Sequence, residues 1–437
     1  MMRVFLSLAA LLLASGSAAA QAVVDTTARP VSLADAIRMA QQNAPSNVQA
    51  RGAISTSEAA VKQSYAAFLP SFTLSAGRRN ERGERFDTQG NLVPFTGQPT
   101  SYSTGLQSSL QIFDGGRRFF DIRAAKADVN AAEAGEIASR YDVALQVKQQ
   151  YYNILAARES QSAAEAQIQQ AEQQLRASSI RLRAGAATVS DSLRSVVALG
   201  NARLAMLSAR NNLQLANATL TRLVASPTPV TATASDTVDQ RVVIPTIDEL
   251  VPLVDGAPAI RQADAELASA KASVRSAKTS FLPTVNMNFN RGGSGLDPAF
   301  GIGDKRYAYN QNLSFSLNFP LFNNLTREVN VARAIVAEDV AEASLRDARY
   351  LARQTLVQSL GQMRIAREQV DIQTQSVAAA TEDVRVQQRR YELGATTLLD
   401  LLTSQAQLDT ARNSLIRARY DYRVAKAQLE ALIGRDL

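Results

Sequence analysis

The 437-residue sequence contains no cysteine, no histidine and no tryptophan. Without cysteine and histidine, the chain has no thiol nucleophile, no serine–histidine triad and no zinc site built from the usual ligands. It cannot form a disulfide, and it carries no nucleotide-binding motif. These absences leave only carboxylate, lysine or hydroxyl chemistry open, and they give no reason to expect a cofactor or a metal.

Long apolar runs are scarce as well. The N-terminus contains one, in which Arg3 precedes the apolar stretch 4–13 and alanines at 18–20 precede Gln21. This pattern predicts a secretory signal peptide over residues 1–20. Because no later stretch has 18 uninterrupted apolar residues, we expect an exported chain that is either soluble or held in a membrane by strands. The net charge of +7 is modest for this length and favours solvated helix faces over a nucleic-acid surface.

The sequence also repeats itself, which predicts tandem halves over residues 21–244 and 245–437. The early matches have an offset of 213 in the numbering, and the later ones an offset of 209. The matching positions are Phe68, Leu69 and Pro70 with Phe281, Leu282 and Pro283, Arg181 with Arg390, Gly185 with Gly394, and Asp191 with Asp400. The four-residue difference must fall in the segments 78–101 and 291–306, which are rich in glycine, proline and charge and are expected to be exposed loops.

Each repeat contains two predicted strands. They are expected at about 69–80 and 102–113 in the first repeat, and at about 282–291 and 307–319 in the second. In the last segment Tyr307, Leu313 and Phe315 fall on one face, while asparagine and serine fall on the other. Pro70 and Pro283 mark the starts of strands, because proline cannot continue a helix. The residues expected to turn the chain back into helix are Asp114, Gly115, Gly116, Asn323 and Asn324.

The predicted helices are unusually long. Residues from about 116 to 183 and from about 325 to 391 contain no proline and no loop cluster, and each would form a rod of roughly 100 Å. Shorter helices are expected at about 188–225 and 397–434. The last of these carries leucine or tyrosine every seven residues from Leu401 to Leu429. Such a heptad pattern predicts a coiled-coil seam.

The strand pattern bears on the membrane. Strands of about ten residues with one apolar and one polar face are typical of outer-membrane barrels, whose interior is wet. One chain supplies too few strands to close a barrel, and an open sheet edge has unpaired backbone groups that hydrocarbon cannot satisfy. Several chains must therefore share one barrel, and three would give about twelve strands. The expected fold combines a membrane β-barrel with long α-helical coiled coils, which form a coiled-coil barrel if the symmetry of the strands is carried through to the helices.

At this point the chain resembles a known family. The paired Phe-Leu-Pro triplets, the segments 112–118 (IFDGGRR) and 390–415, and the tandem halves are similar to the TolC family of outer-membrane efflux and secretion tunnels. The resemblance implies a homotrimer with a shared 12-stranded barrel and a periplasmic tunnel, in the outer membrane of a Gram-negative bacterium. It further implies that the protein has no enzymatic activity and is the exit duct of a tripartite efflux pump or a type I secretion system. The implied partners are a periplasmic adaptor protein and an inner-membrane transporter.

The resemblance also implies site residues. Asp400 matches an aspartate ring at the tunnel constriction, and Thr403 stands where a second ring aspartate is expected. A solvated helix residue is the alternative interpretation of Asp400. A gating network is matched by Tyr391, Asp191, Ser190 and Thr396, of which Thr396 stands in place of an expected arginine. The helix tips that dock the adaptor are matched by Gly185, Ala186, Ala187, Gly394 and Ala395.

Two other classes of protein share part of the pattern. A trimeric surface adhesin or structural coiled-coil protein would have the signal peptide, heptads and strands, but it usually places one strand-forming anchor at the chain end. A periplasmic enzyme or binding protein is disfavoured by the missing residue types. Drug efflux, metal export and protein secretion use the same tunnel, and six methionines without histidine give no support to metal handling.

Overall fold

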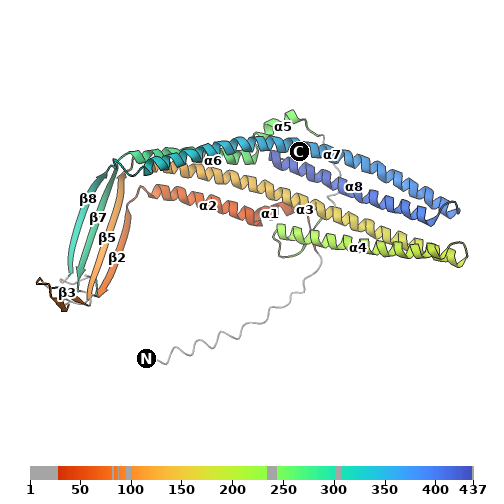
Figure 1. Ribbon diagram of the computed structural model, residues 1–437, viewed down its shortest axis with the longest axis horizontal. Coiled ribbons are helices and arrows are strands. Elements are labelled where there is room, and N and C mark those ends of the chain that lie inside the picture. Colours follow the sequence, from red (N-terminus) through yellow and green to blue (C-terminus); the bar gives the residue numbers. More distant parts are fainter. Residues whose placement is uncertain are drawn as a thin grey trace, which may run out of the picture. The chain divides into compact units, whose positions relative to one another are not determined.

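The computed structural model describes residues 28–80, 83–86, 88–94, 100–233, 244–296, 298–300 and 307–435 (Figure 1). The expected signal peptide, residues 1–20, lies outside this described part. Among the described residues, no helix combines the length and the hydropathy needed to cross a membrane.

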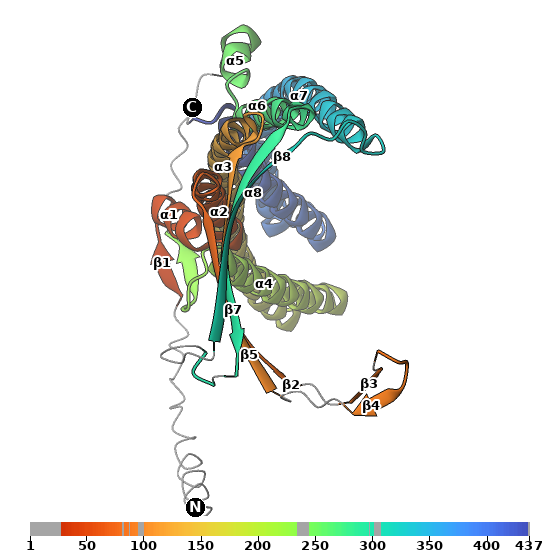
Figure 2. The same cartoon turned by 90° about the vertical axis from the view of Figure 1, so that its left-hand side faces the viewer.

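The sheet contains four antiparallel strands in the order β2-β5-β7-β8 (Figures 1 and 2). Their bounds are Ser71–Asn80 for β2, Thr100–Phe113 for β5, Thr284–Gly295 for β7 and Tyr307–Asn318 for β8. Each repeat thus contributes one hairpin, and the expectation of four strands per chain is confirmed.

The two hairpins have the same register. Ser71 pairs with Ser109 in the first hairpin, and Thr284 pairs with Asn318 in the second. Ser71 and Thr284 are related by the offset of 213, whereas Ser109 and Asn318 are related by the offset of 209. The four-residue difference between the repeats therefore falls entirely in the loop that connects the strands of each hairpin.

The loops contain more regular structure than the sequence predicted. Strands β3 (Glu84–Phe86) and β4 (Leu92–Pro94) form a small antiparallel pair within the first loop. In the second repeat, β7 extends to Gly295, into a segment that glycine content had marked as loop. The glycine at 293 has a packing role, because a Cβ there would lie 2.6 Å from the Tyr307 ring, whose hydroxyl donates to Gly293 O at 3.0 Å.

Long helices follow each hairpin. They are α3 (Arg117–Arg183) and α7 (Thr326–Glu392), each of 67 residues. With a rise of about 1.5 Å per residue each is roughly 100 Å long. The other helices are α1 (Leu33–Asn43), α2 (Pro45–Ala66), α4 (Val189–Leu223), α5 (Ile247–Val254), α6 (Pro258–Lys278) and α8 (Leu398–Ile433), with a 3-10 turn η2 (Thr279–Phe281) after α6.

The chain forms two compact units that do not coincide with the sequence repeats. One contains Met1–Met39 and Gln150–Val238, and the other contains Ala40–Gln149 and Asp239–Leu437. The division falls inside α3, whose two halves belong to different units. The sequence repeats therefore give the order of the elements along the chain, whereas the contacts in space divide the elements into two other groups.

The larger unit has its core between helices α5, α6, α7 and α8. Leu356, Met363 and Leu429 are fully buried there. The heptad positions Leu401, Leu408, Leu415, Tyr422 and Leu429 are all buried. Lys148 of α3 and Glu430 of α8 form an ion pair of 2.6 Å with both side chains largely shielded. The heptad side of α8 is thus the packed side, as the sequence predicted.

The smaller unit contains a parallel strand pair that the sequence did not predict. Strand β1 (Arg29–Val31) pairs with β6 (Val230–Ala232). The fully buried Tyr151 of α3 joins them, since its hydroxyl donates to Val31 O at 3.1 Å and accepts from Thr233 N at 3.0 Å. Arg158 donates to Ala232 O at 2.6 Å.

Candidate functional site

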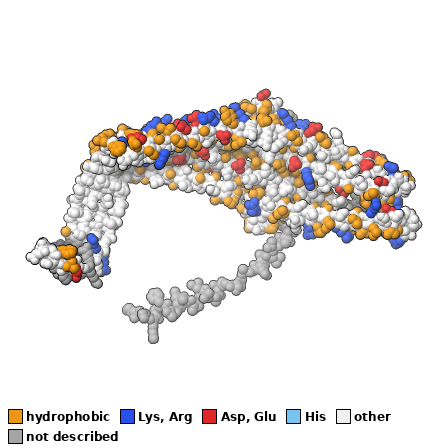
Figure 3. Space-filling view, in the orientation of Figure 1, with side chains coloured by type: hydrophobic (Ala, Val, Ile, Leu, Met, Phe, Trp, Pro, Cys, Tyr) orange, Lys and Arg blue, Asp and Glu red, His pale blue; other side chains and the backbone are white. Residues whose placement is uncertain are grey.

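The sheet separates polar from apolar side chains. One face has rows of uncharged polar residues across neighbouring strands, such as Gln107 opposite Asn290 and Asn290 opposite Asn312. The opposite face is mainly apolar and exposed, with Leu74 at 80% and Leu317 at 70% of full accessibility, and it also carries Arg78 and Arg291 near the hairpin loops. Figure 3 shows one face of the sheet almost entirely in white, because uncharged polar side chains and backbone cover it. A sheet of this kind can face water on one side and hydrocarbon on the other.

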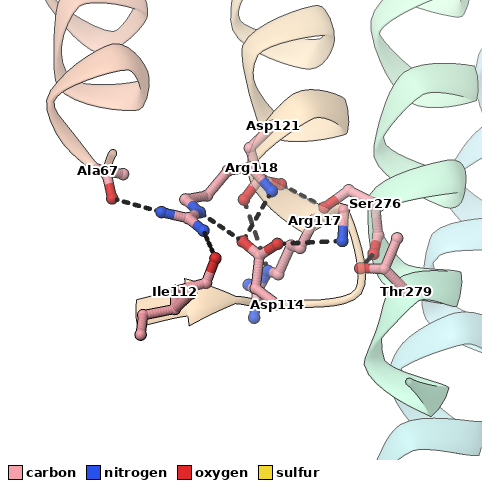
Figure 4. Close-up of polar contacts among 9 residues, drawn as sticks. Ala67, Ile112, Asp114, Arg117, Arg118, Asp121, Ser276 and Thr279 are labelled. Atoms are coloured by element: carbon pink, nitrogen blue, oxygen red, sulfur yellow. Dashed lines mark hydrogen bonds and ion pairs between the residues drawn. The ribbon is translucent and has the colours of Figure 1, made fainter. Parts of the chain in front are cut away.

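A polar cluster links the strands to the long helix of the first repeat (Figure 4). The Asp114 carboxylate accepts from Gly116 N and Arg118 N, both at 3.0 Å, and from Arg118 Nε at 2.9 Å. The Arg118 guanidinium also donates to Ala67 O at 3.2 Å and to Ile112 O at 3.1 Å. One arginine therefore ties the end of α2, the end of β5 and the start of α3 together.

Both glycines of this turn have left-handed backbone angles, and the first also allows a close packing contact. Gly115 and Gly116 have φ values of +70° and +84°. A Cβ at Gly115 would lie 2.6 Å from Leu282 Cβ and 3.0 Å from Thr279 O, so this residue also allows a close approach to the end of η2. Pro70 and Pro283 each directly precede a strand, as expected.

The second repeat builds the same junction with different chemistry. Arg327, which the offset of 209 relates to Arg118, donates to Pro320 O at 2.9 Å and stacks 5.0 Å from the Phe281 ring centroid. Arg118 stacks in the same way over Phe68, at 4.5 Å. Asn323 stands where the first repeat has Asp114, and its Oδ1 atom and Arg327 Nε have no hydrogen-bond partner among the described residues. The aspartate–arginine pair is thus absent here.

Sequence reasoning missed both arginines of these junctions. The signal was available, because Arg118 and Arg327 are related by the offset of 209, and Phe68 and Phe281 by the offset of 213. Asn324, in the place of Gly115, keeps a positive φ of 57°, and Leu325 follows with 61°. The second turn therefore has the backbone of the first without its glycines.

The helix tip of the second repeat lies between α7 and α8. Gly394 has a φ of +73°, Gly394 N donates to Tyr391 O at 3.1 Å, and Ala395 N donates to Arg390 O at 2.8 Å. These two bonds form a Schellman motif, which ends a helix at a left-handed residue. A Cβ at Gly394 would meet no atom within 4 Å, so glycine is needed for its backbone angle and not for space.

Asp400 caps the helix that follows this tip. Its Oδ2 accepts from Thr397 N at 3.1 Å, Thr397 Oγ1 at 2.7 Å and Thr396 Oγ1 at 2.9 Å, while Asp400 N donates to Thr397 Oγ1 at 3.3 Å. This is a reciprocal capping box. The hydroxyl of Thr397, followed by that of Thr396, lowers the pKa of the exposed Asp400 carboxyl below its ordinary value. Thr403 donates to Leu399 O within the same helix.

The helix tip of the first repeat is built in the same way. Gly185 has a φ of +71°, and Ala186 N donates to Arg181 O at 2.8 Å. Asp191 forms the capping box of α4 with Thr188, whose hydroxyl donates to Asp191 Oδ2 at 2.8 Å. Ala187 occupies the position of Thr396, so this tip lacks the additional hydroxyl donor to its aspartate.

The residues expected to form the gate are divided between the two compact units, so the structure gives their contacts within each unit only. Ser190 is exposed in the first turn of α4, and Tyr391 lies half-buried in the last turn of α7. Asp191 belongs to the smaller unit, and Tyr391 and Thr396 belong to the larger one. Within the larger unit, Thr396 donates its hydroxyl to Asp400. A contact between Tyr391 and Asp191 stays a prediction.

A sheet with one wet and one apolar face, continued by 67-residue helices, is typical of membrane channels that extend beyond the bilayer. The family "Outer membrane efflux protein" matches residues 36–226 and 253–435, and the chain belongs to it. The two matched stretches confirm the tandem repeat. The chain is therefore an outer-membrane efflux channel that reaches into the periplasm, and it is not an enzyme.

Individual relatives agree with this assignment. The chain is 27% identical over 416 residues to protein CyaE of Bordetella pertussis, and the match covers 92% of this chain and 84% of CyaE. It is 27% identical over 338 residues to the pyoverdine export outer membrane protein OpmQ of Pseudomonas aeruginosa, and that match covers 76% and 69% of the two chains.

Solved structures show the same fold. The crystal structure of CusC matches with a TM-score of 0.77 at 18% identity, over 93% of this chain and 94% of CusC. The open state of the Neisseria gonorrhoeae MtrE outer membrane channel matches with a TM-score of 0.74 at 20% identity, over 92% and 89%. The mixed fold expected from the sequence is thus confirmed, and the family match favours a channel over an adhesin.

Proposed function

We propose that three copies of this chain close one channel. Each copy would contribute its four strands to a shared barrel of about twelve strands and its long helices to a periplasmic tunnel. The sheet carries the proposal, because β2 and β8 each pair with a single strand within the described sheet. Their unpaired backbone groups would each cost several kcal/mol in hydrocarbon. Pairing between copies removes that cost without adding any other protein to the barrel.

The channel would serve as the exit duct of a tripartite efflux pump or of a type I secretion system in a Gram-negative bacterium. It would receive cargo through a periplasmic adaptor protein and an inner-membrane transporter. The names of matched relatives include pyoverdine export, cobalt-zinc-cadmium resistance and antibiotic efflux. One channel design thus accompanies chemically different cargo, which supports cargo selection by the inner-membrane partner.

The native mass of the detergent-extracted protein tests the assembly. The protein should be recovered from the outer-membrane fraction after urea washing, and its mass, corrected for bound detergent, should be three times that of the mature chain. A monomer would leave the edges of β2 and β8 unpaired in lipid and would contradict the proposal.

Asp400 is proposed to line the periplasmic constriction, with Thr403 one turn further along the helix. Three carboxylates on a narrow axis would raise one another's pKa values. The hydroxyls of Thr397 and Thr396 act in the opposite direction and hold the pKa of Asp400 low. In its ionised form the ring would attract cations.

Single-channel recording in planar bilayers tests this role. Asp400→Asn should lower the preference for cations over anions. Thr397→Ala is the matched control, because it weakens the same helix cap and keeps the Asp400 carboxyl group. Recordings are made at a pH well above the ordinary aspartate pKa, so that this carboxyl is ionised in both the parent and the control. If both variants change the ion preference equally, the cap and not the charge is responsible, and the constriction assignment is wrong.

The gate is proposed to include Tyr391, Asp191 and Ser190, with Thr396 beside them. A hydrogen bond from the tyrosine hydroxyl to the carboxylate would hold neighbouring helices together at the tunnel end. Tyr391→Phe removes only that hydroxyl, so it should increase the fraction of time in which the channel is open. An unchanged conductance record would count against this gate.

The two helix tips are proposed to dock the adaptor through Gly185, Ala186, Ala187, Gly394 and Ala395. The Schellman motifs leave Gly185, Ala186, Gly394 and Ala395 exposed at the ends of the rods, whereas Ala187 is half-buried. Ala395→Trp keeps the left-handed glycine and adds bulk, so it should reduce crosslinking to the adaptor. Efficient crosslinking of this variant would exclude the tip as the docking surface.

A further inference from the structure

The two edge strands of the sheet, β2 and β8, belong to different repeats. Both expose large apolar side chains, such as Phe72 and Leu74 on β2 and Phe315 and Leu317 on β8. If copies close a barrel, β8 of one copy must lie beside β2 of the next. The pairing of these strands therefore rests on the proposed trimer, but its register is a separate question.

Within one chain, two strands from different repeats already pair with each other, namely β5 and β7. Strand β5 is the second strand of the first repeat, and β7 is the first strand of the second repeat. Strand β8 is likewise the second strand of its repeat, and β2 is the first of the other. Because both hairpins share one register, the pairing of β5 with β7 is a template for the pairing of β8 in one copy with β2 in the next.

The template gives a residue-level register. Within the chain, Ser109 pairs with Asn288. Moving Ser109 forward by 209 gives Asn318, and moving Asn288 back by 213 gives Ser75. We propose that Asn318 of one copy lies directly opposite Ser75 of the neighbouring copy, in an antiparallel seam that closes the barrel. The same translation places Leu317 opposite Ala76 and Phe315 opposite Arg78.

The side chains of this seam follow the template. Leu106 faces Arg291 within the chain, and Phe315 would face Arg78, so each apolar residue meets an arginine. Asn318 and Ser75 fall on the polar face, whereas Leu317 and Ala76 fall on the apolar face. A slip by one residue would exchange the two faces of one strand relative to the other. A slip by two keeps the faces and would place Asn318 opposite Thr73 or Gly77 instead.

Disulfide crosslinking distinguishes these registers, and the chain has no native cysteine to interfere. Directly opposed residues of antiparallel strands have Cα atoms about 4.5–5.5 Å apart, within the range of a disulfide. Diagonal neighbours are about 7–8 Å apart, which is too far. The test variant carries Ser75→Cys and Asn318→Cys on the wet face, where an oxidant has access. Three disulfides would then join three copies into one covalent ring.

Two matched variants control the experiment. Ser109→Cys with Asn288→Cys places the template pair within one chain, where oxidation should consume both thiols without raising the mass. Thr73→Cys with Asn318→Cys tests the register slipped by two. We expect covalent trimers on non-reducing denaturing gels for the Ser75 variant, at least tenfold more than for the Thr73 variant.

The outcomes separate the register from the assembly. A threefold native mass with efficient oxidation of the template pair, but without covalent trimers of the Ser75 variant, would overturn the register and leave the trimer standing. Trimers formed by the Thr73 variant would show the slipped seam. A monomeric native mass would contradict the proposed assembly itself. Should the Ser75 variant not assemble, Ala76→Cys with Leu317→Cys tests the same register from the apolar face.

Discussion

The Asp114–Arg118 pair offers a sharp test of how the strands are joined to the long helices. Its side chains are 6% and 12% exposed, and the carboxylate accepts three N–H bonds. Asp114→Ala leaves the Arg118 charge largely buried without its carboxylate, with only the Ala67 and Ile112 carbonyls and the Phe68 ring around it. Breaking a buried pair in this way costs about 3–5 kcal/mol. At about 1.36 kcal/mol per factor of ten, local opening at the start of α3 should become roughly two to four orders of magnitude more frequent.

The second repeat supplies the reciprocal variant. Asn323→Asp puts a carboxylate beside Arg327, whose Nε has no partner among the described residues. A hydrogen bond to a charged group contributes about 1.5–3 kcal/mol. Amide exchange at the start of α7 should therefore slow by roughly ten- to a hundredfold. Asp114→Asn copies the second repeat into the first and should lose less stability than Asp114→Ala.

Hydrogen–deuterium exchange of the detergent-solubilised protein, read by mass spectrometry on peptides from each junction, measures these changes. Peptides from the middle of α7 serve as an internal reference. If Asp114→Ala changes exchange at the start of α3 by less than tenfold, the pair does not hold the junction. Faster exchange in Asn323→Asp would mean that the desolvated carboxylate is not compensated by Arg327.

Two further substitutions can be tested by hydrogen exchange, and one change of pH can be tested by proteolysis. Leu325→Gly relieves a left-handed φ of 61°, which costs a side-chain-bearing residue about 1–2 kcal/mol, so exchange at the start of α7 should slow by about tenfold. Gly115→Ala brings a methyl group within 2.6 Å of Leu282 Cβ and should speed exchange in η2 at least tenfold. The Thr397 hydroxyl, first among several donors, lowers the pKa of Asp400 in the folded protein below the ordinary value of 3.8. The Asp400 cap therefore stabilises α8 fully above pH 3.8, and this stabilisation is lost as the pH falls through the folded pKa. Peptic cleavage in the first turn of α8, relative to Asp400→Asn at the same pH, should therefore rise below pH 3.8, and a constant ratio would refute the cap.

The long elements could be predicted from the sequence because their signals are repeated many times. Alternation over ten or more residues defined the strands, and the absence of proline over 67 residues defined α3 and α7. The heptad pattern of α8 predicted which side of this helix is buried. The offset of 213 or 209 added a second, independent copy of each signal. Local pattern and global fold agree in these segments, which is why the expectation held.

Short elements gave no such signal. Strands β1 and β6 have three residues each and lie far apart in the sequence, so no period could reveal their pairing. They depend on Tyr151 and Arg158, whose long-range contacts a sequence does not show. At the tips, in contrast, a signal was overlooked. Threonine followed three residues later by aspartate is a capping-box pattern, and it occurs at Thr188 and again at Thr397.

The two junctions also differ in what each one would face in the proposed ring. In the first repeat Gly115 approaches Leu282, a residue of the same chain, and the contact forms as the chain folds. In the proposed ring, the equivalent residue Asn324 faces Leu69 of a neighbouring copy. Its Cβ prevents an equally close approach, so this joint must be looser than its template. Asn324→Gly should therefore let the seam close further and raise the temperature at which trimers dissociate in detergent. A variant whose trimers dissociate at a lower temperature would show that the asparagine side chain itself contributes to the contact between copies.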